Sequence, residues 1–226
     1  MIIGICGFIG SGKDTAADYL VGFHGFRRDS FAGTLKDAVS AVFGWDRELI
    51  EGRTPEARAW REQVDTWWAE RLGMPHLTPR WILQWWGTEV CRQHFHDDIW
   101  IAALQSRLAR RTDHTVISDV RFPNEIKAIK EQGGRIVWIQ RGQLPSWHIM
   151  AAKANAGDVV AQTKLNELGI HASETSWVGT DFDAILDNNG SIEQLYNQLR
   201  SLVQVQQDAR ANEIYSQPVD SLSTMS

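Results

Sequence analysis

Long apolar runs are missing from this sequence of 226 residues. No stretch approaches the roughly 20 apolar residues that a membrane-spanning helix needs. The first residues also lack the basic and apolar segments of a secretory signal. We therefore expect a cytosolic protein that has no membrane partner.

The sequence also has few cysteines and carries a negative net charge. The two cysteines, Cys6 and Cys91, and the seven histidines show no metal-binding spacing, so we expect the cysteines to be reduced packing residues. A net charge of -5 argues against a broad nucleic-acid-binding surface. Anionic ligands must then be held by local clusters of Arg and Lys, which suits small phosphate compounds better than DNA.

Apolar stretches alternate between strand and helix signals along the chain. Strands are expected near residues 2–6, 26–29, 115–118, 135–139 and 182–186, and helices near 13–24, 33–43, 55–72, 78–95, 97–110, 124–132 and 191–202. This alternation predicts an α/β fold, with a parallel sheet of about five strands between two layers of helices. We expect one domain over 1–206, with a helical region over about 45–112, an inserted lid over about 143–177 and a flexible tail over 207–226.

A phosphate-binding loop directly follows the first predicted strand. The sequence from Gly7 to Thr15, GFIGSGKDT, stands between a predicted strand and a predicted helix, which is the context that this motif requires. Loop amides and the positive end of the helix would bind phosphate oxygens, and the lysine would reach the β- and γ-phosphates. The predicted ATP contacts here are Gly7, Gly10, Ser11, Gly12, Lys13 and Thr15.

One position departs from the usual form of the loop. Asp14 stands where a Ser or Thr hydroxyl would bind magnesium, and the hydroxyl comes one residue later, at Thr15. Asp14 could hold Mg²⁺ directly, hold it through water, or accept a proton from the acceptor phosphate. The sequence leaves these three alternatives open.

An acidic residue and an arginine follow the buried strand near 115–118. P-loop folds place a carboxylate that meets magnesium at such a strand end, and Asp119 fits that place. Arg121 would project from the same edge toward a phosphate. The alternative is an Asp–Arg pair that only caps the strand.

The predicted helix over 78–95 has one polar face. At about 100° per residue, an arc of about 120° contains Arg80, Gln84, Gly87, Thr88 and Arg92. Two planar guanidinium groups, an amide and a glycine suit a nucleotide better than solvent, although an ordinary exposed helix remains the alternative. Trp81 and Trp85 border this face, and either could stack on a base.

These segments together resemble the phage-type deoxynucleoside monophosphate kinases, a branch of the P-loop nucleoside monophosphate kinase-like fold. The likeness runs from residue 2 to about 202 and follows a fixed order of motifs. They are Gly7 to Thr15, Phe31-Ala32 with Leu35-Lys36, Arg80 to Gln84, Gly87-Thr88-Glu89 with Arg92, Asp97 with Trp100, Asp119 to Glu125, Ser173-Glu174, and Asp187 to Gly190.

The resemblance implies transfer of the ATP γ-phosphoryl group to a deoxynucleoside 5′-monophosphate, with Mg²⁺, in viral DNA precursor synthesis. It implies catalytic roles for Lys13, Asp14, Asp119 and Arg121, with Asp14, Thr15 and Asp119 near the metal. Acceptor-phosphate candidates are Lys36, Arg92 and Arg121; Arg80 and Gln84 would lie nearer sugar or base, and Glu125 and Glu174 in the substrate site. Arg141 and Asn188 would join the ATP site. A homodimer remains open.

Two other functions remain as alternatives at this point. A different small-molecule P-loop kinase, such as one similar to dephospho-coenzyme A kinase, would share the loop and the Asn-Gly turn after the last strand. A nucleotide-dependent interaction module would need no acceptor pocket. Such a module would leave the polar helix face that begins at Arg80 unexplained.

Overall fold

Five parallel strands form the centre of the computed structural model, which describes residues 1–215. The strands are β1 (Ile2–Cys6), β2 (Arg27–Asp29), β3 (Thr115–Ile117), β4 (Arg135–Gln140) and β5 (Ala184–Asp187). Their order in the sheet is β2-β3-β1-β4-β5, and every neighbouring pair is parallel. The parallel α/β sheet that the sequence predicts is confirmed. No helix among the described residues is long and apolar enough to cross a membrane.

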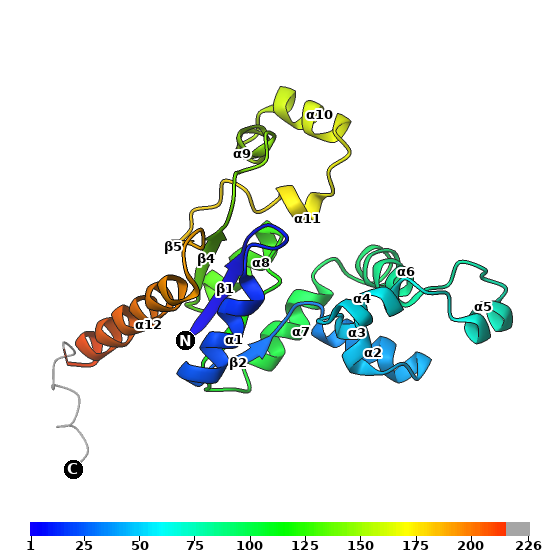
Figure 1. Cartoon of the computed structure of the whole chain (residues 1–226), viewed down its shortest axis with the longest axis horizontal. Helices are drawn as coiled ribbons and strands as arrows, with labels where there is room; N and C mark the ends of the chain where they lie inside the picture. Colours follow the sequence, from blue (N-terminus) through cyan, green and yellow to red (C-terminus); the bar gives the residue numbers. More distant parts are fainter. Residues whose placement is uncertain (216–226) are drawn as a thin grey trace, which may run out of the picture.

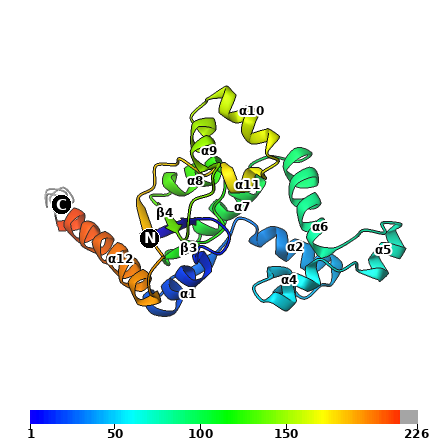
Figure 2. The ribbon, with the colours of Figure 1, turned by 45° about the horizontal axis from the view of Figure 1, so that its top comes forward.

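Helices cover both faces of the sheet (Figures 1 and 2). One face of β1, β3 and β4 packs against α1 (Lys13–His24) and α12 (Ile192–Tyr215), through side chains such as Leu20 and Leu195. The other face packs against α7 (Ile99–Leu108) and α8 (Pro123–Glu131), through Leu104 and Ile129. Burial on both faces explains why the central strands are almost entirely apolar.

A separate apolar core organises the helical region to one side of the sheet. This helical region consists of α2 (Gly33–Phe43), α3 (Arg47–Glu51), α4 (Pro55–Arg61), α5 (Thr66–Leu72), α6 (Pro79–Trp85) and the π-helix η1 (Trp86–Gln93) (Figure 1). Trp45, Ile50 and Leu77 are buried at its centre, and several further tryptophans pack around them. Tryptophan in this region therefore serves mainly to build the core.

Two long helices expected from the sequence are shorter than predicted. The helix expected over 55–72 ends first at Arg61. Asp65 then starts α5 as a new helix, because its carboxylate accepts hydrogen bonds from Trp68 N (3.1 Å) and Trp45 Nε1 (2.7 Å). The helix expected over 78–95 changes to a π-helix at Trp86. There Gly87 packs closely on Leu35, and its carbonyl accepts a hydrogen bond from Trp100 Nε1 (3.0 Å).

The expected insertion lies between β4 and β5. It contains α9 (His148–Asn155), α10 (Val159–Glu167) and α11 (Ala172–Thr175), and Figure 1 shows it beyond the end of β4. Trp177 packs on Phe8 of the β1–α1 loop, with ring centroids 4.8 Å apart, so the insertion contacts the phosphate-binding loop. The last helix continues to Tyr215, past the end expected near 202. The remainder of the expected tail, 216–226, lies outside the described residues.

Candidate functional site

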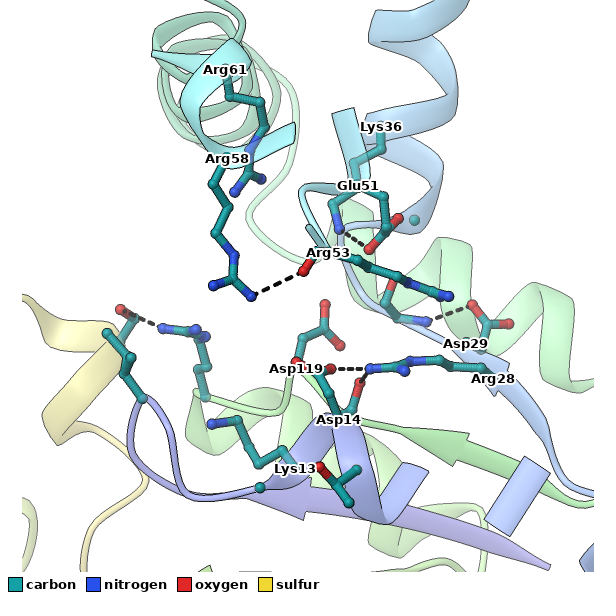
Figure 3. Close-up of a pocket in the computed structure, with 18 of the residues that line it drawn as sticks. Lys13, Asp14, Arg28, Asp29, Lys36, Glu51, Arg53, Arg58, Arg61 and Asp119 are labelled. Carbon is teal, nitrogen blue, oxygen red and sulfur yellow. Dashed lines mark hydrogen bonds and ion pairs between the residues drawn. The ribbon is translucent and has the colours of Figure 1, made fainter. Parts of the chain in front are cut away.

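A cavity of about 1260 Å³ lies at the carboxyl edge of the sheet (Figure 3). Its walls come from the β1–α1 loop, the ends of β2 and β3, the α3–α4 segment and α11. Eleven arginines and two lysines line it against six carboxylates among the described residues. A chain of net charge -5 thus concentrates positive charge at one place, as a small anionic ligand requires.

The phosphate-binding loop forms one wall of this cavity. Lys13 Nζ donates hydrogen bonds to Gly7 O (2.7 Å) and Phe8 O (2.8 Å), while burial and the nearby Arg121 lower the pKa of Lys13. Gly12 has a φ of 98°, and a Cβ there would lie 2.3 Å from Asn188 Nδ2. That nitrogen donates to Ser11 O (2.8 Å). Asn188 therefore supports the loop backbone from behind and does not line the cavity.

The predicted metal-binding residues Asp14, Thr15 and Asp119 all line this cavity. Asp14 forms an ion pair with Arg28, which also donates to Ser118 Oγ (2.9 Å). The Asp119 carboxylate accepts hydrogen bonds from the backbone N–H groups of Phe31 (3.1 Å) and Ala32 (3.3 Å). Burial raises the pKa of Asp119, against the opposite effects of Lys36 and of these two bonds. No cluster of three His, Cys, Asp or Glu side chains arranged for a metal ion occurs within residues 1–215.

Arg121 projects from the end of β3 into the cavity, as the sequence predicts. Its Nη1 donates to Glu174 Oε1 (2.9 Å) and Ser173 Oγ (3.2 Å) on α11. Arg141 lines the same cavity. The phosphate-binding loop, the β3 end and the insertion therefore converge on one space.

Glu125 lies elsewhere than its predicted place in the substrate site. It is 6% exposed, does not line the cavity, and accepts hydrogen bonds from the backbone N–H groups of Arg121 and Phe122. Burial, together with Asp119, raises the pKa of Glu125 to about 7. The first turn of α8 places this carboxyl against the backbone of Arg121 and Phe122, outside the cavity. Glu125 can therefore affect a ligand in the cavity only through Arg121, which lines it.

Lys36, Arg80 and Gln84 line the cavity wall formed by the helical region. Glu51 binds both Lys36 Nζ (2.6 Å) and Arg47 Nη1 (2.7 Å). Burial disfavours the Glu51 charge, but these two cations lower the pKa of Glu51 to about 2. Two cations that face the cavity thus share one carboxylate.

The other residues of the predicted polar helix face do not line the cavity. They are Trp81, Trp85, Gly87, Thr88 and Arg92. Trp81 and Trp85 stack on each other, with ring centroids 5.3 Å apart, and Arg92 Nε donates to Asp97 O (3.2 Å). The predicted continuous face is wrong because the π-helix changes the angle per residue after Trp85.

Arg53, Arg58 and Arg61, which follow Arg47 in the α3–α4 segment, line the cavity although sequence reasoning missed them. Arg58 donates to Gly52 O (3.1 Å) and Arg53 O (3.2 Å), and Arg61 donates to Ile50 O (3.4 Å). Figure 3 shows Arg58 and Arg61 on the side of the cavity opposite Lys13. Within residues 1–215, no carboxylate lies within ion-pair distance of these three arginines. The high density of arginine between residues 47 and 61 is the sequence feature that could have predicted this wall.

No protein-family model matches the chain. A protein named as a deoxynucleotide monophosphate kinase, from Acanthamoeba polyphaga mimivirus, is 31% identical over 217 residues, which cover 90% of this chain and 96% of that protein. The deoxynucleoside-5′-monophosphate kinase of Escherichia phage T5 is 28% identical over 180 residues, covering 58% of this chain and 72% of that protein.

Solved structures include kinases with distant similarity to this chain. Shikimate kinase from Aquifex aeolicus is 13% identical with a TM-score of 0.45, covering 92% of this chain and 98% of that chain. Dephospho-CoA kinase from Campylobacter jejuni is 13% identical with a TM-score of 0.39, covering 90% and 95%.

Replacing Glu51 with Gln tests the shared ion pair. Because the folded-state pKa of Glu51 lies near 2, below its ordinary 4.5, its charge stabilises the fold above pH 4.5. That contribution is lost as the pH falls from 4.5 toward 2. We expect Glu51→Gln to cost about 1 kcal/mol of unfolding free energy at pH 7, and less at pH 4 and pH 3. Urea unfolding at these pH values measures it, with exposed Glu48→Gln as control; an equal loss at every pH would contradict the ion pair.

Proposed function

The chain belongs to the deoxynucleotide monophosphate kinase family, and we propose that it transfers the γ-phosphoryl group of ATP to a deoxynucleoside 5′-monophosphate. The products are the deoxynucleoside diphosphate and ADP. One observation carries the proposal: a single cavity has a phosphate-binding loop on one wall, and on another wall arginines that pair with no carboxylate of residues 1–215 (Figure 3). Two anionic nucleotides that exchange a phosphoryl group need such an arrangement.

The donor side of the reaction belongs to the phosphate-binding loop. Its amides and Lys13 would bind the ATP phosphates, and Asn188 would keep the loop backbone in place. Phosphoryl transfer asks the protein mainly for positioning and neutralisation of charge. Lys13 and Arg121 are close enough for Arg121 to lower the pKa of Lys13. These two cations are therefore our candidates for contact with the transferring group, and Arg141 would contact the donor phosphates from the end of β4.

The oxygen-bearing residues of the same wall suit Mg²⁺. This ion takes oxygen ligands and keeps several waters, so one or two carboxylates plus ATP phosphates suffice to hold it. Thr15, Asp14 and Asp119 would supply these protein ligands, and the bound ion would neutralise charge on the β- and γ-phosphates. Asp14 would meanwhile keep Arg28 at the edge of the cavity through their ion pair.

The acceptor side belongs to the helical region. Lys36, Arg53, Arg58 and Arg61 offer cationic donors for a monophosphate. Gln84 lines the same wall and carries both a hydrogen-bond donor and an acceptor, as reading a base edge requires. Nucleotide specificity would therefore come from the surface between α4 and α6.

A coupled assay of ADP release against deoxynucleoside and ribonucleoside monophosphates and dephospho-coenzyme A tests the proposed reaction. We expect turnover with deoxynucleoside monophosphates. Lys13→Ala should lower it at least about a hundredfold, because a preorganised cation at the developing charge contributes several kcal/mol. Circular dichroism checks that the variant folds. Turnover only with dephospho-coenzyme A, or ATP hydrolysis that no acceptor stimulates, would contradict the proposal.

Arg53→Ala tests the acceptor wall. The Arg53 side chain lines the cavity and is exposed, so its removal should leave the fold intact. We expect the KM for the deoxynucleoside monophosphate to rise about tenfold, because a charge-assisted hydrogen bond contributes about 1.5–3 kcal/mol. The KM for ATP should stay within about twofold of its original value.

The matched control for Arg53 is Arg71→Ala, an exposed arginine of α5 that does not line the cavity. It should leave both Michaelis constants unchanged. A rise in the KM for ATP alone in Arg53→Ala would assign this wall to the donor.

A further inference from the structure

Glu125 makes one more hydrogen bond at the start of α8 than capping this helix requires. It is the third residue of the helix, and its Oε2 accepts hydrogen bonds from two successive backbone N–H groups, of Arg121 (2.8 Å) and Phe122 (3.1 Å). A capping glutamate needs to satisfy only the second of these, at the residue that precedes the helix. The bond to Arg121 reaches one residue farther, into the segment that faces the cavity.

The segment that carries Arg121 is held at several points. Before it, the carboxylate of Asp119 accepts the N–H groups of Phe31 and Ala32, and Val120 is buried with 2% exposure. At Arg121 itself, Glu125 holds the backbone, while Ser173 and Glu174 hold the guanidinium group. The backbone of Arg121 is thus held by α8 and its side chain by α11.

Keeping a carboxyl at the Glu125 position is costly. The side chain is 6% exposed, and the nearby Asp119 carboxylate repels its charge. The Glu125 charge also raises the pKa of the Cys6 thiol of β1, after the larger effect of burial. Arg92 of η1 and the two backbone N–H groups favour the charge. Burial of a carboxyl costs free energy that only good hydrogen bonds offset, and a helix start can be capped by an exposed residue at no such cost. The buried contact to the Arg121 backbone is therefore what this position adds.

We propose that Glu125 is a positioning residue for phosphoryl transfer, which fixes the backbone of Arg121 so that its guanidinium group meets the transferring phosphoryl group. The proposal rests on the proposed function. A preorganised donor stabilises the transition state because it does not reorient during the reaction. Loosening the Arg121 backbone would let the guanidinium group move, and a misplacement of about 1 Å can cost about a hundredfold in rate.

Two substitutions separate the hydrogen bonds from the rest of the side chain. Glu125→Ala removes the acceptor, and kcat should fall about a hundredfold while the KM for ATP stays within about twofold. Glu125→Gln keeps one carbonyl oxygen that can accept both N–H groups, so its kcat should stay within about threefold of the original. Exposed Glu131→Gln on the same helix is the matched control and should change nothing. A rise in the acceptor KM alone would mean that Glu125 contacts substrate, and would overturn the proposal.

A double-mutant cycle with Arg121→Ala tests whether Glu125 acts through Arg121. If it does, Glu125→Ala should lower kcat by less than about twofold once Arg121 has been removed. An equal loss in both backgrounds would overturn the proposal, because the two residues would then act independently. If Glu125→Ala does not fold, Glu125→Asp takes its place. Its side chain is shorter by one methylene group and should not reach both N–H groups.

Amide hydrogen exchange, followed by NMR in the unliganded chain, gives a readout that does not depend on the reaction. We expect exchange at Arg121 and Phe122 to be at least about tenfold faster in Glu125→Ala than in the original chain or in Glu125→Gln. Unchanged exchange in Glu125→Ala would overturn the positioning role. If the original chain phosphorylates no deoxynucleotide, the proposed function fails, while the exchange rates still decide whether Glu125 fixes this segment.

Discussion

Repulsion among thirteen cationic side chains that face one cavity is the constraint on which the rest of this structure depends. Left unopposed, so much like charge would oppose folding around the cavity. Carboxylates oppose it pair by pair, mostly across elements that are distant in sequence. The pairs include Asp14 with Arg28, Asp29 with Arg107 and Arg111, Asp37 with Arg47, Glu51 with Lys36 and Arg47, and Glu174 with Arg121. Arg53, Arg58 and Arg61 have no such partner among the described residues, so an incoming phosphate would find their charge available.

The parallel sheet makes this concentration of charge achievable. Because all five strands point the same way, the loops after β1, β2 and β3 open at the same edge. The helical region, with its own tryptophan-rich core, supplies the facing wall without drawing on the main core. The insertion contributes α11, which holds Arg121, and it packs on the phosphate-binding loop through Phe8 and Trp177. The phosphate-binding loop, the helical region and the insertion therefore border one cavity, and the insertion contacts the loop directly.

Local signals located the phosphate-binding loop that lines the cavity, and tertiary contacts explain what these signals missed. The segment from Gly7 to Thr15 is a contiguous motif that lies directly after β1, so the sequence alone locates it. Asp119 and Arg121 follow from the end of a strongly apolar strand. The change to a π-helix at Trp86 depends on Leu35 and Trp100, which no pattern within the helix reveals. Similarly, Glu125 reads as one acidic residue among several until the fold shows that its oxygen faces the Arg121 backbone.

The central claim is that one cavity receives donor and acceptor together, with phosphates between Lys13 and the α3–α4 arginines. The most direct measurement is calorimetric titration with a bisubstrate compound, in which five phosphates join adenosine to a deoxynucleoside. The account predicts that one molecule binds per chain, more tightly than ATP or the monophosphate alone, and that either nucleotide competes with it. Competition by ATP alone, with no effect of the monophosphate, would show that the acceptor binds elsewhere and would contradict the account.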